Sequence, residues 1–374
     1  MHTTHGSPPP MALLNFTYHP TAPGLSFSVH TGRCVALLGI GDRSQDFASL
    51  SLALAGHIPV RAGSLQVSGE NVTSQPAGHR KLATIGPHTP LFPHLSVAEN
   101  CLFPLKARSQ LSESAMHHRV SETLALTGLD AVRSVLPGKL TAEQTFRAQL
   151  ARALILRPEA IVLDHPFTGL DHASVLRQIA LLEKLQRAIG LSLLLLTHNR
   201  TEALLLGDVI GVMENGHLLQ LGNAPTLLQR PASESIAVAF GEANVLTGKV
   251  LYTDDDCAEL RLPSGETVEA MASHGLEEHD LAAICVPPDK LSVMFPRSAT
   301  LAKEETEGMV IGTLVSARHL GTVIHIRFRM QDGGELIAHR PPVHTLKDLE
   351  PGRLALLAWQ TANATAFPMD QKSG

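Results

Sequence analysis

The chain has 374 residues, of which 44% are hydrophobic, and its formal net charge is −5 with histidine neutral. This length exceeds that of one ordinary hydrophobic core, so we expect two domains. A slightly acidic chain offers no general attraction for nucleic acid, and we expect no nucleic-acid partner.

Short apolar runs alternate with helix-length segments in the first half of the chain. Residues 96–157 have a helical pattern, clearest at Ser121–Leu129 and Phe146–Leu156. The apolar runs are short and apolar on both faces, which is typical of parallel strands covered by helices. The runs that predict such strands are Cys34–Leu38, Ala160–Leu163, Leu191–Thr197 and Asp208–Met213.

The pattern changes near residue 241, where short alternating strands and turn residues begin. This spacing predicts a small all-β barrel or sandwich, with a polar linker at residues 297–308. We therefore predict domains at residues 1–240 and 241–374. The expected strands are Gly248–Tyr252, Ala258–Leu262, Ala282–Val286, Val310–Val315, Val323–Phe328 and Arg353–Trp359.

The cysteines and the N-terminal residues indicate the cellular compartment in which the protein works. The four cysteines lie far apart and form no CxxC pair, which favours a reducing compartment over a disulfide framework. Residues 1–10 contain no apolar core typical of a signal peptide. No run approaches the roughly 18 apolar residues that span a bilayer, so a membrane role requires a partner.

Three segments together carry a family resemblance. Leu140–Asp171 reads LTAEQTFRAQLARALILRPEAIVLDHPFTGLD, which matches LSGGQ-x-x-R-x-x-L-A-R-A-L, an apolar strand and D-E-P-x-S-x-L-D without a gap. Leu195–His198 with the residues after it, and Leu91–Val97, match two further segments. The chain thus resembles the ATP-binding subunits of ABC importers over nearly its whole length. Its tail is similar to the TOBE/MOP-like regulatory barrels of iron(III), polyamine, sulfate, molybdate and sugar importers.

The resemblance implies a fold, cofactors and partners. It implies a RecA-like P-loop NTPase core of α/β class with an antiparallel β portion and a helical subdomain, followed by a small OB-like all-β barrel. The implied cofactors are ATP and Mg²⁺. The implied partners are transmembrane permease subunits, a second nucleotide-binding subunit (identical or different) and, indirectly, a periplasmic solute-binding protein. The implied location is the cytoplasmic face of the inner membrane.

The phosphate loop of the family, G-x-x-x-x-G-K-[ST], is altered. After Gly39 the chain reads Ile40-Gly-Asp-Arg-Ser-Gln-Asp46, so Ser44, Gln45 and Asp46 occupy the places of the second glycine, the lysine and the hydroxyl residue. The stretch before Gly56 is two residues longer than expected, and the segment also fits a loop that merely joins strand to helix. A unit charge pair near 4 Å is worth ~4 kcal/mol at an effective dielectric near 20. Losing the lysine therefore weakens nucleotide binding. The candidate nucleotide-binding residues are Tyr18 (adenine stacking, or core), Gly39, Gly41, Arg43 (a substitute cation), Ser44, Gln45, Asp46 and Asp164.

The second nucleotide motif retains one carboxylate. Asp164 ends an apolar strand, where the family holds Mg²⁺ through water, and His165 follows in place of the family's catalytic glutamate. A neutral imidazole accepts a proton, so His165 is either a general base or a packed histidine. His198 stands at the switch-histidine position and is the second candidate catalytic residue.

The signature motif implies a dimer interface. It reads Leu140-Thr-Ala-Glu-Gln144, so Thr141 keeps a hydroxyl and Gln144 is retained. Ala142 and Glu143 replace two glycines, and we expect Glu143 to bring negative charge toward the partner's γ-phosphate. Asp171 occupies the D-loop position.

Coupling to a membrane subunit is predicted one segment earlier. The glutamine expected near residue 87 is Pro87, but Leu91–Val97 keeps the family pattern. We expect an exposed apolar lip there, with Leu91 and Phe92 receiving a helix of the permease. The 20 histidines show no tight ligand spacing, so we expect no further metal site.

Three functions follow from this pattern. The chain is a divergent motor that still uses MgATP, or a non-catalytic pseudo-ATPase partner, or a platform for a ligand-sensing barrel. Losses at several functional points beside an intact scaffold favour the second mechanism, although a decaying gene would show the same pattern.

Overall fold

The computed structural model describes residues 7–19, 23–41, 45–108, 110–254, 256–296, 308–342 and 349–369, with the backbone alone at residues 45 and 46. The chain divides into two compact units, Met1–Ala224 and Pro225–Gly374. Within these ranges, no helix is both long enough and apolar enough to cross a membrane.

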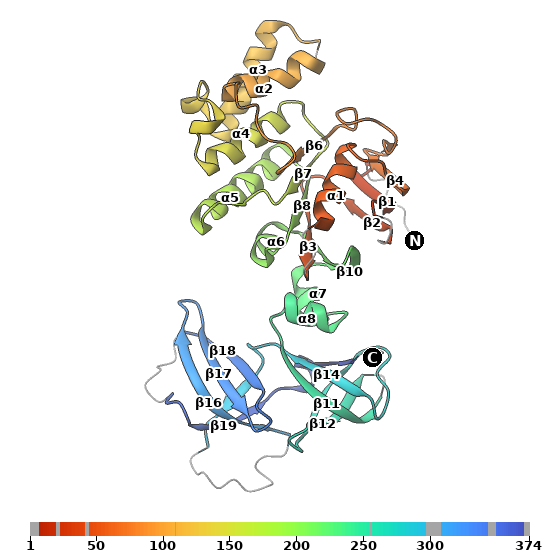
Figure 1. Cartoon of the computed structure of the whole chain (residues 1–374), viewed down its shortest axis with the longest axis vertical. Coiled ribbons are helices and arrows are strands. Elements are labelled where there is room, and N and C mark those ends of the chain that lie inside the picture. The colour runs from red at the N-terminus through yellow and green to blue at the C-terminus, as the bar shows by residue number, and fades with distance from the viewer. Residues whose placement is uncertain are drawn as a thin grey trace. The chain divides into compact units, whose positions relative to one another are not determined.

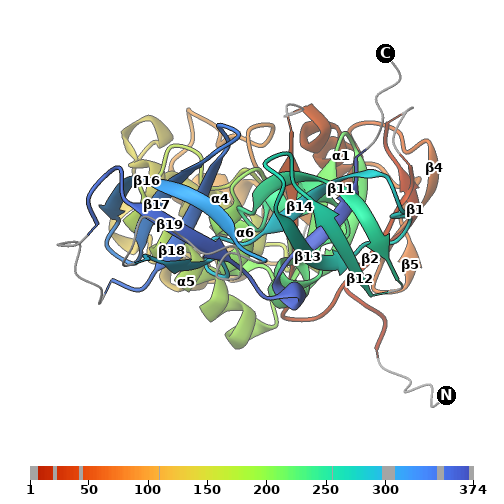
Figure 2. The same ribbon diagram turned by 90° about the horizontal axis from the view of Figure 1, so that it is seen from below.

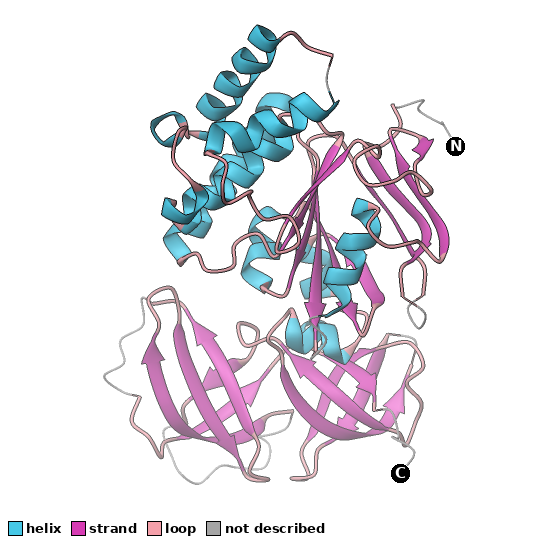
Figure 3. Ribbon diagram, turned by 45° about the horizontal axis from the view of Figure 1, so that its top comes forward, coloured by secondary structure: helices cyan, strands magenta, loops and turns pink. Residues whose placement is uncertain are grey.

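The first unit contains two sheets (Figures 1 and 3). One is four-stranded and antiparallel, in the order β2-β1-β4-β5, and the other is six-stranded, in the order β10-β9-β3-β8-β7-β6. The larger sheet is parallel except for β10, which pairs antiparallel with β9. The strands are β1 Met11–Thr17, β2 Leu25–Val29, β3 Cys34–Ile40, β4 Ala62–Val67, β5 Glu70–Asn71, β6 Leu82–Ile85, β7 Ala160–Asp164, β8 Leu193–Thr197, β9 Val209–Glu214 and β10 His217–Gly222.

Helices complete this unit. Helix α1 lies between the two sheets, and its Phe47, Leu50 and Leu54 belong to one core with residues of both (Figure 1). Helices α2, α3 and α4 bury a separate core, which confirms the helical portion expected from the pattern. The helices are α1 Gln45–Ala55, α2 Val97–Arg108, α3 Glu113–Thr127, α4 Ala142–Leu154, α5 His172–Ile189 and α6 Arg200–Leu206, with 3₁₀ turns at Asp130–Val132 and Pro137–Lys139.

The second unit is mainly β structure (Figure 2). A closed barrel has the order β11-β12-β13-β20-β14, and beside it a five-stranded sheet has the order β15-β19-β16-β17-β18. The sequence predicted strands of both, with Val310–Val315, Val323–Phe328 and Arg353–Trp359 falling on β16, β17 and β19, but not the division into a barrel and a second sheet. Its elements are α7 Ala224–Gln229, α8 Glu234–Ala239, β11 Asn244–Thr253, β12 Cys257–Arg261, β13 Thr267–Ala272, β14 Leu281–Val286, β15 Ser292–Met294, β16 Val310–His319, β17 Ile324–Met330, β18 Glu335–Arg340, β19 Leu354–Ala358, a 3₁₀ turn at Thr361–Asn363 and β20 Thr365–Pro368.

One asparagine joins the barrel to the five-stranded sheet. The Asn244 amide, 7% exposed, donates to the carbonyls of Val286 (3.1 Å) and Ile337 (2.9 Å), and its oxygen accepts from the amide of Ile337 at 2.7 Å. The two β structures share one hydrophobic core. The division at residue 225 precedes the boundary expected at 241, and α7 and α8 account for the difference.

Candidate functional site

The carboxyl end of β3 is the centre of the candidate site. β3 lies between β8 and β9, so its end meets the ends of parallel neighbours, where ligands bind in open α/β sheets. Gly39 lies against His198, and a Cβ there would be only 2.4 Å from the ring. Gly41 follows with a φ of +82°, a conformation that favours glycine.

The loop from β3 to α1 carries most of the predicted phosphate contacts. Arg43 and Ser44 lie outside the described residues, as do the side chains of Gln45 and Asp46. The backbone of Gln45 begins α1, so the strand, loop and helix order expected of a phosphate loop is present. Helix N-termini favour anions, although the chain supplies glutamine where the family has lysine.

An aromatic cluster of Phe47, His165 and His198 occupies the end of β3. The two imidazole rings stack at 5.1 Å with 30° between their planes, and Phe47 lies 5.9 Å from His165 and 5.1 Å from His198. Phe47 is only 1% exposed. Sequence reasoning missed this residue, although a phenylalanine directly after Asp46 was a visible signal.

Hydrogen bonds fix both histidines. Nδ1 of His165 lies 2.8 Å from Oδ1 of Asp164, and Nδ1 of His198 lies 3.0 Å from the Gly39 carbonyl. Both partners accept, so each Nδ1 is the donor, and in the neutral ring Nε2 keeps its lone pair. His165 has a φ of +46°, an uncommon conformation for a residue with a Cβ. The backbone is therefore strained at the position where the family has glutamate.

A half-buried carboxyl group, that of Glu202, lies near this cluster. Glu202 accepts a hydrogen bond from the Thr197 hydroxyl at 2.5 Å. Burial raises the pKa of Glu202, and the hydrogen bond from Thr197 and the nearby His165 oppose that rise. The sequence showed Glu202 only as part of the family pattern. Its proximity to His165 could not be predicted, because it depends on the packing of α6.

The described side chains at this site include one carboxylate, that of Asp164, in the place where the family holds magnesium. Mg²⁺ prefers oxygen ligands in octahedral geometry, and the carboxylate of Asp164 is already paired with His165. No group of three histidine, cysteine or acidic side chains suited to a metal occurs in the described part of the chain. With Gln45 at the lysine position, the described site offers two imidazoles and a buried ring instead of an ammonium group.

The signature segment forms the start of α4. Thr141 is the N-cap: its hydroxyl accepts from the Gln144 amide at 3.2 Å, and the Gln144 side chain accepts from the Thr141 amide at 3.0 Å. This reciprocal pair is a capping box, which explains why threonine and glutamine at this spacing begin a helix. Ala142 is the first helical residue.

Glu143, which the sequence predicts to bring negative charge toward a partner's γ-phosphate, is paired with two arginines of its own chain. Its carboxylate lies 2.8 Å from Arg147 on α4 and 2.9 Å from Arg177 on α5. The hydrogen bond from Arg177 is the main cause of a lowered pKa for Glu143. Two arginines thus compensate the negative charge that replaced a glycine.

Asp171 begins α5. Its carboxylate accepts from the Ser174 amide at 2.7 Å, and this hydrogen bond is the main reason for its lowered pKa. An N-cap of this kind stabilises a helix by about 1 kcal/mol. In this structure, the D-loop aspartate has a local structural role.

The predicted coupling segment is only partly exposed. Leu91 is 7% exposed and belongs to the core of the helical portion, so the expectation of an exposed lip is wrong for this residue. Phe92 is half-buried, with its ring 4.7 Å from that of Phe103, which is 50% exposed. The guanidinium of Arg152 lies 5.7 Å from the Phe92 ring.

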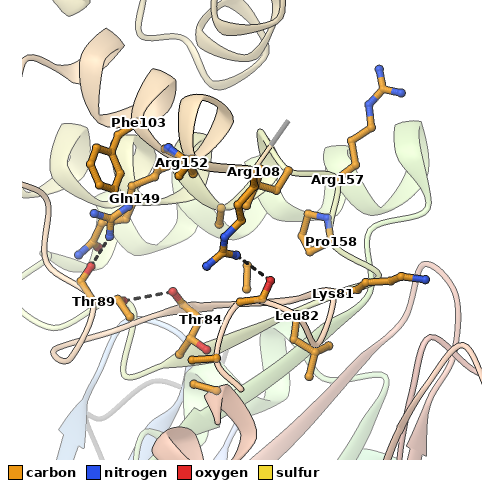
Figure 4. A pocket seen from close by; sticks show the side chains of 18 of the residues that line it. Lys81, Leu82, Thr84, Thr89, Phe103, Arg108, Gln149, Arg152, Arg157 and Pro158 are labelled. Atoms are coloured by element: carbon orange, nitrogen blue, oxygen red, sulfur yellow. Dashed lines mark hydrogen bonds between the residues drawn. The ribbon is translucent and has the colours of Figure 1, made fainter. Parts of the chain in front are cut away.

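A cleft of about 520 Å³ opens beside these rings (Figure 4). It lies between α2 and α4 on one side and β6 with the end of α1 on the other. Arg108 crosses it to donate to the Gly78 carbonyl at 2.8 Å, and Arg152 donates to the carbonyls of Thr89 (2.5 Å) and Pro90 (2.7 Å). Arginine, lysine, histidine and apolar side chains line the cleft, and no acidic side chain is among the described residues that do so.

Known proteins resemble this chain in sequence and in fold. Residues 23–168 match the family model described as "ABC transporter". The spermidine/putrescine import ATP-binding protein PotA of Rubrobacter xylanophilus is 31% identical over 90% of this chain and 86% of its own. The Fe(3+) ions import ATP-binding protein FbpC of Brucella melitensis is 32% identical over 88% of both chains. This chain belongs to the ATP-binding subunits of the ABC transporter family.

A solved structure agrees with the family fold. That of cbiO1 from Clostridium perfringens, part of the ABC transporter complex cbiONQ, superposes with a TM-score of 0.51 at 20% identity. The match covers 59% of this chain and 90% of that one. The α/β NTPase fold and the family resemblance predicted from the sequence are confirmed.

One predicted nucleotide contact of the family is not available. Tyr18 is 4% exposed and packs into the core between the two sheets, together with Phe16 and Phe47. Because its ring is covered by other side chains, it presents no face to an adenine, and of the two alternatives that the sequence left open Tyr18 takes the core position. An aromatic residue just after an apolar strand fits the core equally well in sequence.

Proposed function

We propose that the chain is the nucleotide-binding-domain subunit of an import complex at the cytoplasmic face of a membrane, with little or no ATP hydrolysis of its own. In this role it pairs with a second such subunit and supports permease subunits, which a periplasmic solute-binding protein supplies with solute. The relatives' names, which describe import, support this role. The aromatic cluster of Phe47, His165 and His198 supports the loss of hydrolysis.

The physical argument concerns two separate losses. Binding of the triphosphate needs a cation at the first turn of α1, where the chain has Gln45. Activation of water needs a base near the γ-phosphate, and His165 is instead hydrogen-bonded to Asp164 and stacked on His198. Because binding and proton transfer use different groups, restoring one does not restore the other.

Phosphate release at saturating MgATP tests this proposal. We expect a turnover far below the 1 s⁻¹ or more that is ordinary for enzymes. His165→Glu alone should remain equally inactive, because the missing lysine still prevents binding. A wild-type turnover near 1 s⁻¹ would overturn the proposed loss of hydrolysis but leave the proposed role in import intact. The His198→Ala variant is the control for a contaminating ATPase, because it should abolish turnover that belongs to this chain.

We further propose that the cleft beside Phe92 and Phe103 receives a helix of a permease subunit. The half-buried ring of Phe92 and the exposed ring of Phe103 supply apolar area, and Arg108 and Arg152 favour a segment that carries an acidic residue (Figure 4). Such a helix would have to displace or accommodate the Arg108 side chain that crosses the cleft.

Co-purification with co-expressed membrane subunits tests this contact. Phe103→Asp and Phe92→Asp should each reduce the complex yield at least tenfold, since loss of a buried aromatic anchor costs about 2 kcal/mol or more. Leu126→Asp is the matched control, because Leu126 is 36% exposed on α3 and does not line the cleft. Equal yields for all three variants would place the contact elsewhere.

A further inference from the structure

Two arginines of the helical portion reach across the cleft, and their surroundings differ. Arg152 on α4 is half-buried and donates to the carbonyls of Thr89 (2.5 Å) and Pro90 (2.7 Å). Arg108 in the last turn of α2 is exposed and donates to the Gly78 carbonyl at 2.8 Å (Figure 4). The contacts of Arg152 are those of a structural anchor, whereas an exposed arginine can exchange a carbonyl partner at low cost.

The guanidinium of Arg108 lies in a place that a side chain at residue 78 would block. Gly78 has a φ of +84°, and a Cβ at this position would overlap Nη2 of Arg108. Gly78 belongs to the loop after β5 and Arg108 to α2, so their hydrogen bond ties the helical portion to the rest of the first unit. In the free chain, therefore, this side chain occupies space that a docked helix needs.

The lining of the cleft provides no carboxylate for this guanidinium. The described residues that line it include three further lysine or arginine side chains and no acid. Two acids stand beside the lining: Glu70 lies 3.8 Å from the Lys81 amine, and the Glu159 amide donates to the Lys81 carbonyl. A carboxylate binds a guanidinium more strongly than a neutral carbonyl does, because it adds charge and a second acceptor. A carboxylate brought into the cleft would therefore take Arg108 over from Gly78.

We propose that Arg108 is a gate of the cleft, which selects a permease helix that carries an aspartate or glutamate opposite Gly78. The acidic side chain replaces the Gly78 carbonyl as the partner of Arg108. A helix with a neutral residue at that place breaks the hydrogen bond between Arg108 and Gly78 and supplies no partner in return, so the gate discriminates against it. This inference rests on the proposed docking of a permease helix in the cleft, and it adds the residue that selects the helix.

Charge reversal in the chain co-expressed with the permease subunits tests the gate. Arg108→Glu should lower the complex yield about tenfold or more, because two carboxylates then face each other. Arg108→Ala should lower it only about threefold, since a partly exposed ion pair is weak. Lys106→Glu is the matched control: Lys106 is exposed in the same last turn of α2 and does not line the cleft, so its yield should stay within about twofold of the wild type. Equal melting temperatures of the two glutamate variants verify that the fold is intact.

A second measurement separates a gate from an ordinary salt bridge. Each aspartate and glutamate in the cytoplasmic loops of the permease subunits is replaced in turn by alanine. One of these replacements should lower the yield with the wild-type chain about threefold or more. Combining it with Arg108→Ala should raise the yield again, because the side chain that must be displaced is gone. In an ordinary salt bridge the double replacement would be no better than the permease replacement alone.

Three results would overturn the inference. An unchanged yield for Arg108→Glu beside a loss for Phe103→Asp would keep the docking site and remove the gate. A double replacement without recovery would make Arg108 an ordinary contact of the helix. Unchanged yields for both Arg108→Glu and Phe103→Asp would overturn the proposed docking in this cleft, and the gate with it.

Discussion

Restoring the phosphate loop tests whether chemistry or architecture was lost at the end of β3. The change replaces Ser44, Gln45 and Asp46 by glycine, lysine and threonine. Gln45 is the first residue of α1, so a lysine there lies at the helix end that faces a phosphate. A unit charge pair near 4 Å contributes ~4 kcal/mol at an effective dielectric near 20, and the threonine also removes the carboxylate of Asp46. We therefore expect affinity for MgATP to rise roughly a thousandfold.

Calorimetry with MgATP measures this change, and a matched variant isolates the lysine. The control carries glycine, glutamine and threonine at the same three positions and should lack most of the gain. Hydrolysis should stay low in the repaired variant until His165 is also changed to glutamate, because binding and water activation use different residues.

Two outcomes would refute this reasoning. A well-folded repaired variant that binds no MgATP at millimolar concentration would mean that the loop itself has been remodelled, as the two extra residues before Gly56 suggest. Binding that appears only when Phe47→Thr is added would mean that the buried ring, not the missing cation, blocks the site. That addition removes a fully buried aromatic side chain at a cost of about 3 kcal/mol or more, so urea unfolding must verify the fold.

Three further predictions concern the scaffold and are checked by urea unfolding. Arg80→Ala should lower the unfolding free energy by about 3 kcal/mol, because the buried guanidinium donates to four backbone carbonyls at the end of α1 and in the loop after β5. The control, Lys184→Ala at an exposed position, should change the unfolding free energy by less than about 0.5 kcal/mol. Asn244→Ala should lower it by about 2 kcal/mol, since two carbonyls and an amide lose their partner; unchanged stability would show that water replaces the side chain. Because Arg177 lowers the folded-state pKa of Glu143, the stability that this carboxylate contributes is present above about pH 4.5 and is lost as the pH falls through the lowered pKa. The unfolding free energy of Glu143→Gln should accordingly fall less steeply than that of the wild type as the pH is lowered below about 4.5. Equal pH dependence in the two proteins would contradict the pairing of Glu143 with Arg177.

Local sequence determined the elements and the family. Strands β3, β7, β8 and β9 are predictable because each is apolar on both faces, a pattern that only a strand buried between layers requires. The helix starts at Thr141 and Asp171 are also determined by local sequence, since each capping side chain accepts a hydrogen bond from the backbone amide three residues later.

Tertiary structure alone decided what the site residues do. Phe47, His165 and His198 come from three distant segments, and only the parallel order of β3, β8 and β7 brings their rings together. Leu91 looked like a surface contact, and Tyr18 fitted either an adenine contact or the core, yet both are buried, because solvent exposure depends on the elements that pack over a residue. Glu143 looked like an unbalanced charge until α5 placed Arg177 beside it. The sequence gives the chemical type of each residue, whereas long-range packing sets its burial and its interaction partners.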